Sequence, residues 1–193
     1  MALSLAKGQK ISLEKEAGTT LRKVVMGLGW DAKKSKGVFG FGGSAPDIDL
    51  DASCVMFDEQ KQMVDSCYFR QLRSKDGSVI HSGDNRTGAG EGDDEQIVVD
   101  LTAVPATVKT LMFTVNSFTS VTFDQIDNAF CRVFDQATNK EIAKFTLSSG
   151  GTHTAMIMAK LYRHSGEWKM AAIGENAAGR TFQDLMPAMT PHL

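Results

Sequence analysis

The most informative stretch of the sequence is "DIDLDAS", residues 47–53. An extended backbone sends successive side chains to opposite faces, so Asp47, Asp49 and Asp51 point to one side. The residues at the alternate positions form an apolar face: Ile48, Leu50, Ala52, Cys54 and Met56. This alternation predicts a strand whose apolar side faces the core.

The acidic side of this strand needs a physical reason. Two carboxylates about 4 Å apart repel by roughly 4 kcal/mol at an effective dielectric near 20. A folded domain has a total stability of only about 5–15 kcal/mol. One interpretation is a solvated strand face, where water and salt relieve the repulsion. The other is a bound cation.

Length and composition indicate an ordinary globular protein. The chain has 193 residues and a mass of 20.9 kDa, with 42% hydrophobic and 23% charged residues. This length favours one domain over residues 1–193, and no apolar run approaches membrane-spanning length. Lys7 and Lys10 interrupt the N-terminal segment, which does not resemble a signal peptide. We expect a cytoplasmic protein.

The cysteines and the net charge exclude several classes. Cys54, Cys67 and Cys131 are odd in number, widely spaced and without a C-x-x-C pair. This argues for buried, reduced thiols rather than a disulfide framework or a zinc site. The formal net charge of −2, with scattered Lys and Arg, argues against binding of nucleic acid.

Short segments rich in β-branched and aromatic residues alternate with turns such as "KDGS" and "HSGE". This pattern favours a mainly β protein, an antiparallel sandwich or barrel with a few short helices. The predicted strands are residues 21–30, 51–57, 66–72, 96–101, 109–118, 129–134, 141–147 and 167–174. A helical turn or two is expected near 123–130, and another at 180–189, ended by Pro187 and Pro191. Residues 154–164 fit a helix or a strand.

A second acidic cluster lies in "GDNRTGAGEGDDEQ", residues 83–96, which holds five carboxylates and one base, Arg86. Its hard oxygen donors are Asp84, Asn85, Glu91, Asp93, Asp94 and Glu95, and Asp31 ends an apolar segment elsewhere. Calcium takes six to eight oxygens, whereas zinc prefers Cys or His. The donors therefore fit calcium, and they suffice for two ions.

Other motifs fit less well. Asp47, Asp49 and Asp51 match the first positions of an EF-hand, but Ala52 replaces its glycine and Asp58 its final glutamate. The glycine-rich residues 37–43 lack the order of a phosphate-binding loop. His81 adjoins Ser82, yet neighbours on extended backbone point apart, and no G-x-S-x-G elbow is present.

Four motifs, "GLGWD", "DIDLDAS", "HSGDNRTGAGEGDDE" and "LYRHSGEWK", resemble the TerD family of bacterial tellurium-resistance and stress proteins. The resemblance spans nearly the whole chain, and "NAFCRVFDQ" and "GRTFQDLMP" resemble its TerZ branch. It implies a calcium-binding β-sandwich without catalytic activity. It also implies a cytoplasmic role in resistance to tellurite, other chemical stress and phage, alongside sister proteins and a membrane component. The implied calcium ligands are Asp31, Asp47, Asp49, Asp51, Asp84, Asn85, Asp93, Asp94 and Glu95.

Three functions remain to be distinguished. The first is a non-enzymatic, calcium-loaded module that assembles with other stress proteins, at the inner membrane face, and is a monomer or weak oligomer alone. The second is a metal-dependent enzyme of the phosphoesterase type, because clustered carboxylates can hold two catalytic metals. The third is direct tellurite chemistry at the three thiols.

Overall fold

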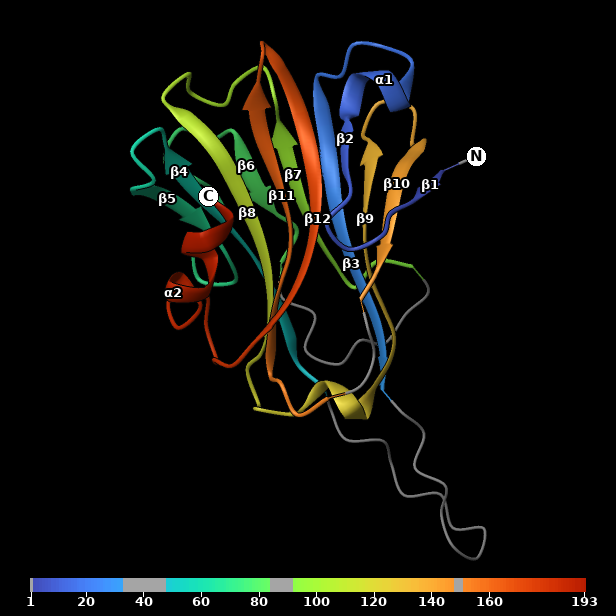
Figure 1. The fold of residues 1–193 in the computed structure, drawn as a ribbon, viewed down its shortest axis with the longest axis vertical. Helices are drawn as coiled ribbons and strands as arrows, with labels where there is room; N and C mark the ends of the chain where they lie inside the picture. The colour runs from blue at the N-terminus through green and yellow to red at the C-terminus, as the bar shows by residue number, and fades with distance from the viewer. Residues whose placement is uncertain (1, 33–47, 84–91, 148–150) are drawn as a thin grey trace, which may run out of the picture.

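The computed structural model describes residues 2–32, 48–83, 92–147 and 151–193. Two six-stranded sheets pack face to face (Figure 1). The first sheet has the order β1 (Leu3–Ser4), β10 (Glu141–Thr146), β9 (Ile126–Asp135), β3 (Lys23–Ala32), β7 (Glu95–Asp100) and β6 (Val79–His81). The second has the order β2 (Lys10–Ser12), β12 (Glu167–Ala177), β11 (Ala155–His164), β8 (Val108–Ser117), β4 (Leu50–Asp58) and β5 (Met63–Cys67).

The strand pairs confirm the predicted mainly β, antiparallel sandwich of two sheets. Every pairing between these strands is antiparallel except that of β1 with β10, which is parallel. The predicted apolar face of β4 lies against the core between the sheets. There Ile48, Leu50, Ala52, Cys54 and Met56 are at most 3% exposed, within one cluster that draws side chains from both sheets.

The helical predictions were partly right. The expected turn near 123–130 is a 3-10 helix, Phe123–Gln125, after which β9 begins. The ambiguous residues 154–164 form β11. At the C-terminus the helix α2 is only Met186–Met189, and Pro187 lies in its first turn rather than ending it. A first-turn proline costs no hydrogen bond, because that N–H has no partner within the helix.

Two further short helices were not predicted. The helix α1, Leu13–Ala17, ends at Gly18, whose φ of 73° is the left-handed conformation that favours glycine at a helix end. A 3-10 turn, Thr190–His192, follows α2.

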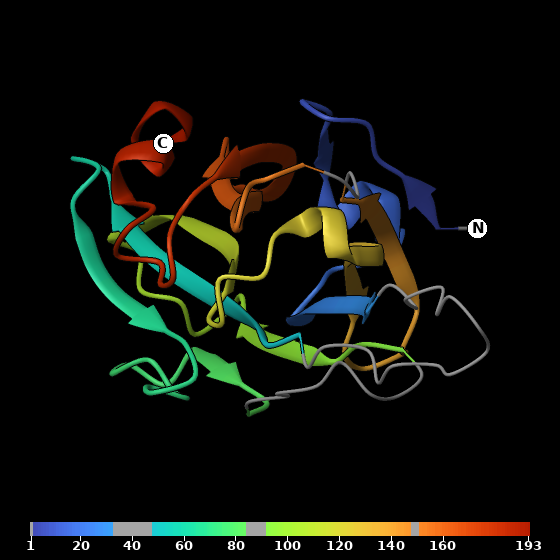
Figure 2. The same ribbon diagram turned by 90° about the horizontal axis from the view of Figure 1, so that it is seen from below.

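The C-terminal segment covers the outer face of the second sheet (Figures 1 and 2). Phe182, Leu185 and Met189 pack against Val55 and Phe57 on the outer side of β4. They form a second apolar cluster, separate from the core between the sheets. Consequently β4 is buried on both faces over most of its length, and its buried carboxylate, Asp51, lies near its start.

Candidate functional site

The start of β4 and the residue directly before it place two acidic side chains on the outer face of the second sheet. Asp49 is 9% exposed and Asp51 is 4% exposed, so neither belongs to a solvated strand face. Their neighbour in the predicted ligand set, Asp47, lies outside the described residues. Burial of carboxylates is costly unless they are paired or hold a cation.

Polar side chains on β8 lie opposite this acidic half. Asn116 is the register partner of Asp51, and Thr114 is that of Ser53. Directly opposed residues of an antiparallel pair share a face, so these groups adjoin the carboxylates. Within the described part of the chain, the buried Oδ1 of Asn116 has no hydrogen-bond partner. Asn116 therefore offers an additional oxygen atom as a candidate ligand. The sequence analysis did not identify it, because Asn116 lies in the largely apolar segment 109–118, which was interpreted only as a strand.

The C-terminal segment begins at the same place. Asn116 Nδ2 donates to the carbonyl of Gly179 at 3.4 Å, and Arg180 Nε donates to the carbonyl of Phe118 at 3.1 Å. The N–H of Phe118 in turn donates to the carbonyl of Asp49 at 3.1 Å. Residues beside Asp49 and Asp51 thus hold the start of the C-terminal segment, which continues over Val55 and Phe57 on the same face of the sheet.

A second acidic group lies where β3 ends, at the same end of the sandwich as the start of β4 (Figure 2). Asp31 is exposed and accepts a 2.8 Å hydrogen bond from Asn128 Nδ2. Its register partner on β9 is another acid, Asp127. Like charges directly opposed across strands are destabilising, and a cation would relieve the repulsion. Asp127 was not predicted, because its segment was interpreted as a helical turn.

Asp94 is tied to the same strand end. Its Oδ2 accepts the backbone N–H of Trp30 at 2.9 Å, and the Trp30 indole donates to the carbonyl of Ile48 at 3.2 Å. Burial raises the pKa of Asp94, and the charges of Asp31, Asp93 and Glu95 raise it further. An anion with neighbours of the same charge is where a cation binds most favourably.

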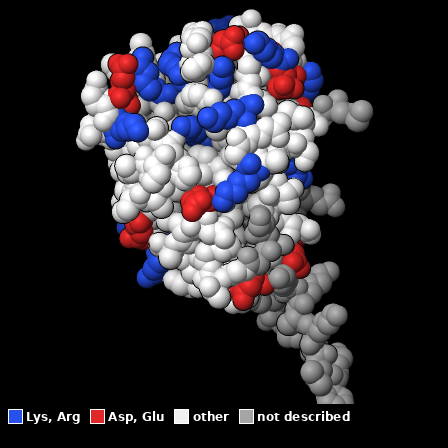
Figure 3. All heavy atoms as spheres, viewed as in Figure 1, with Lys and Arg blue, Asp and Glu red and all other residues white. Residues whose placement is uncertain are grey.

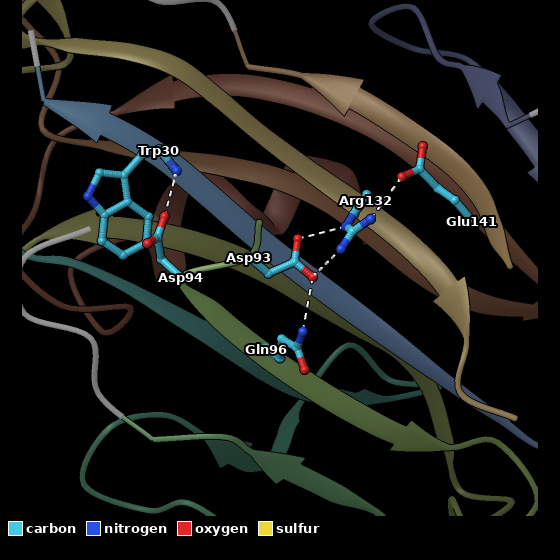
Figure 4. Close-up of polar contacts among 6 residues, drawn as sticks. All are labelled: Trp30, Asp93, Asp94, Gln96, Arg132 and Glu141. Atoms are coloured by element: carbon cyan, nitrogen blue, oxygen red, sulfur yellow. Dashed lines mark hydrogen bonds and ion pairs between the residues drawn. The ribbon is translucent and has the colours of Figure 1, made fainter. Parts of the chain in front are cut away.

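Asp93 has a different environment (Figure 4). Its carboxylate accepts two hydrogen bonds from Arg132, at 2.7 and 3.0 Å, and a third from Gln96 at 3.1 Å. Arg132 also bonds Glu141 at 3.1 Å. A Cβ at Gly27 would lie 2.2 Å from Asp93 Oδ2, so this glycine makes room for the carboxylate over β3. The contacts of Asp93 are those of a structural ion pair.

Glu95 closes the edge of β4 at Ala52, just outside the stretch of β4 that pairs with β5. Its Oε2 accepts the N–H of Ala52 at 2.6 Å and lies 3.4 Å from His81 Nε2, which is 3.2 Å from the carbonyl of Ala52. The N–H of Gly83 donates to His81 Nδ1, which assigns the ring proton to Nε2. Both side chains are buried. Glu95 and His81 thus bond the backbone N–H and carbonyl of Ala52, as a neighbouring strand would. Because both residues belong to the first sheet, these bonds join the two sheets.

The predicted ligands therefore form separate groups. Asp49 and Asp51 lie with Asn116, Asp31 lies near Asp94, Glu95 bridges the sheets, and Asp93 pairs with Arg132. Among the described residues, no three His, Cys, Asp or Glu side chains are arranged to hold one metal ion. Asp47, Asp84, Asn85 and Glu91 lie outside those residues. Coordination of calcium by the full set stays a prediction.

The state of the thiols agrees with the sequence prediction, whereas the basic side chains are less evenly scattered than expected. On the face shown in Figure 3, most of the Lys and Arg side chains lie toward the upper part of the view. Cys54, Cys67 and Cys131 are buried, free thiols, as predicted. None of the described helices has the length and apolar character to cross a membrane.

Comparison with known proteins assigns the family. The chain matches the TerD domain over residues 1–188. It belongs to the TerD family. It is 48% identical over 185 residues to the tellurium resistance protein TerZ of Serratia marcescens, covering 95% of this chain and 94% of that protein. The tellurium resistance protein TerD of the same organism is 39% identical, covering 93% of each chain, so the TerZ branch is supported.

Other relatives extend the family beyond tellurium resistance. The general stress protein 16U of Bacillus subtilis is 43% identical, with 93% of each chain covered. Among solved structures, the protein of unknown function SAV2460 superposes with a TM-score of 0.69 at 22% identity, covering 86% of this chain and 96% of that one. A TerD homologue from Streptomyces coelicolor gives 0.67 at 21% identity, covering 83% and 92%. These structures share the fold.

Proposed function

We propose that this TerD-family chain is a non-catalytic calcium-binding module that acts with partner proteins in the cytoplasmic response to tellurite, other chemical stress and phage. The observation that carries the proposal is the burial of Asp49 and Asp51 at the start of β4, beside the side-chain Oδ1 of Asn116, which has no hydrogen-bond partner among the described residues. Hard oxygen donors in this number and charge suit calcium better than zinc or copper.

Two ions would account for the two acidic groups. Asp49 and Asp51, with Asn116, would hold one ion, and Asp31 and Asp94, with Asp127, would hold the other. The predicted ligands Asp47, Asp84, Asn85 and Glu95 would complete the two coordination shells. Calcium would neutralise the neighbouring carboxylates whose charges help to raise the pKa of Asp94.

The names of the relatives support the stress role. The relatives include proteins named for tellurium resistance and for the general stress response. A calcium-loaded sandwich without a catalytic site would act through partners, which we propose are sister proteins of the same family, assembled at the inner membrane face. The chain alone is expected to be a monomer or a weak oligomer.

Phosphoesterase chemistry is not favoured. A metal-dependent hydrolase needs a base or a positioned water beside the metal. Among the described histidines, the one beside the predicted ligands is His81, and its Nε2 is directed to Glu95 and to the carbonyl of Ala52 inside the sandwich. It is 3% exposed and does not face Asp49 or Asp51 on the outer side of β4.

The test is calcium titration by calorimetry together with thermal melting in EDTA, Mg²⁺ and Ca²⁺. We expect heat of calcium binding and a higher melting temperature, with a smaller effect of Mg²⁺, which sheds its water reluctantly. Asp51→Asn should reduce both effects. The control Glu59→Gln removes an exposed carboxylate just beyond the other end of β4 and should change neither. Equal melting in all three conditions without binding heat would refute calcium binding.

A second experiment addresses partner and enzyme together. Affinity capture from stressed cells, with and without chelator, should recover family proteins only when calcium is present. In parallel, phosphomonoester and phosphodiester substrates should show no turnover with Ca²⁺, Mg²⁺ or Mn²⁺. Turnover lost in Asp49→Asn would instead establish the enzyme.

A further inference from the structure

Two of the three thiols face each other across strands. Cys54 of β4 and Cys67 of β5 are register partners, and both are fully buried. Cys131 lies in β9 at the centre of the other sheet, where its register partners are Leu28 and Phe145. The chain therefore has one cross-strand pair of thiols and one equally buried thiol whose strand partners carry no sulfur.

The backbone sets a short distance between the paired thiols. Opposed residues of an antiparallel pair direct their side chains to the same face, with Cβ atoms about 4.5–5.5 Å apart. A disulfide needs Cβ atoms roughly 3.5–4.5 Å apart, so a small shift suffices. Burial raises the pKa of both thiols, and the neighbouring Cys67 raises that of Cys54 further.

Access to the pair depends on β5. This strand has five residues and lies at the edge of its sheet, and β4 is its one partner strand among the described residues. Met63 and Val64 in its first half are each 41% exposed. Short edge strands are the elements that open locally at low free-energy cost. By contrast, Cys131 lies in β9, which is held between β10 and β3.

We propose that Cys54 and Cys67 form a redox-sensitive dithiol site that hydroperoxides convert into a disulfide between β4 and β5. One thiol, as thiolate in the transiently opened strand, attacks the peroxide O–O bond and becomes a sulfenic acid. For hydrogen peroxide the leaving hydroxide takes up a proton to become water. The second thiol then attacks the sulfenic sulfur and releases another water. In total two thiols lose two hydrogens and one peroxide is reduced to two waters.

The disulfide would fasten the edge strand to the sheet. The cross-link closes a loop of residues 55–66, which restricts the unfolded chain more than the folded one. Strand β4 also carries Asp49 and Asp51, so oxidation would stiffen the strand proposed to hold calcium. The dithiol site does not depend on calcium binding, and its test is independent of that proposal.

The experiment treats the reduced full-length protein with hydrogen peroxide, then blocks remaining thiols and measures intact and tryptic masses without reduction. We expect a loss of about 2 Da, reversed by dithiothreitol. The cross-linked peptide should join residues 37–61, which contain Cys54, to residues 62–70, which contain Cys67. Peptide 110–132 should carry the blocking group on Cys131, which shows that this thiol was not oxidised. The oxidised protein should melt several degrees higher.

The variants provide matched controls. Cys131→Ala should form the disulfide as the wild type does, whereas Cys54→Ala and Cys67→Ala should lose it and its stabilisation. If these variants fold poorly, the peptide map of the wild type still decides. Three thiols that stay reduced in the folded protein, oxidation spread equally over all three, or a cross-link through Cys131 would each overturn the proposal.

Discussion

The two halves of β4 have the same backbone but different surroundings. In the first half, Asp49 and Asp51 occupy the outer face, and the free edge at Ala52 is closed by Glu95 and His81. In the second half, Val55 and Phe57 occupy the outer face under the C-terminal segment, and β5 covers the edge. One strand thus combines a half suited to hold a cation with a half that packs in the usual apolar way.

This contrast indicates how the proposed metal site could be built without losing the fold. The inner face of β4 is apolar along its whole length and fixes the register. The outer face can then change from a carboxylate at Asp51 to an apolar side chain at Val55, four residues later. The energetic consequences should differ accordingly: the acidic half should respond to calcium, and the apolar half should be insensitive to it.

Removal of calcium should have the largest effect. A ligand at about a thousand times its dissociation constant stabilises by roughly 4 kcal/mol per site. In a chain of this length each kcal/mol shifts the melting temperature by about 2–4 °C. We therefore expect chelation to lower melting by roughly 10 °C per occupied site, measured by scanning calorimetry. If chelation lowered the melting temperature by about a degree or less, the acidic half of β4 would be as insensitive to calcium as the apolar half.

Phe57→Ala should have the next largest effect, but one independent of calcium. The side chain is 1% exposed within the outer apolar cluster, and truncation of a buried Phe costs about 3–5 kcal/mol. Melting should fall equally with EDTA and with calcium. If the calcium-dependent shift also disappeared, the two halves would be one cooperative unit, and the contrast would fail.

The fold could be predicted from sequence further than the site. The inner face of β4 follows from alternation alone, and seven of the eight predicted strands overlap their observed counterparts over most of their length. The strand predicted at 66–72 was misplaced, because β5 ends at Cys67 and Tyr68 already pairs with Gln71 in a turn. The very short β1, β2 and β6 carry too few residues for a period to be detected.

The site was predictable as residue types but not as contacts. Clustered acids indicated a cation, yet nothing in "GDDE" distinguishes Asp93 from Asp94. The distinction arises because Asp93 lies over Gly27 of β3, where Arg132, the register partner of Gly27 on β9, binds its carboxylate. The roles of Asn116 and His81 also depend on long-range register, which one sequence does not specify.

Asp93→Asn should lower the unfolding free energy of the metal-free protein by about 1–3 kcal/mol. The substitution breaks the bidentate pair with Arg132, whose partner carboxylate is fully buried. Sequence alone predicts the reverse, because removal of one of several acids relieves repulsion. Urea unfolding in EDTA measures the sign. A stabilised variant would mean that Asp93 belongs with the ligands rather than with Arg132.

Glu95→Gln separates the structural and the metal role of one side chain. The amide oxygen can still accept the N–H of Ala52, so the metal-free protein should lose only about 1–2 kcal/mol, as a charged acceptor is replaced by a neutral one. If Glu95 is also a ligand, the calcium-dependent shift should fall markedly. An unchanged shift would restrict Glu95 to closing the edge of β4.

Asp94→Asn should give the smallest effect and the opposite sign from Asp93→Asn. Burial and the nearby carboxylates raise the pKa of Asp94 in the folded state, so the folded chain binds this proton more tightly than the unfolded chain. Without calcium, the unfolding free energy should therefore fall as the pH rises from about 4, the ordinary pKa of an Asp, through the raised value. Asparagine removes this loss and should stabilise the metal-free protein at pH 7 by less than about 1 kcal/mol, because solvent screens a partly exposed carboxylate.

Unfolding in EDTA between pH 4 and pH 7 measures the difference in stability between Asp94→Asn and the wild type, which should shrink toward pH 4. With calcium present the sign should reverse, since the variant lacks a ligand. A variant less stable than the wild type in EDTA at pH 7 would show that the hydrogen bond from Trp30 outweighs the repulsion.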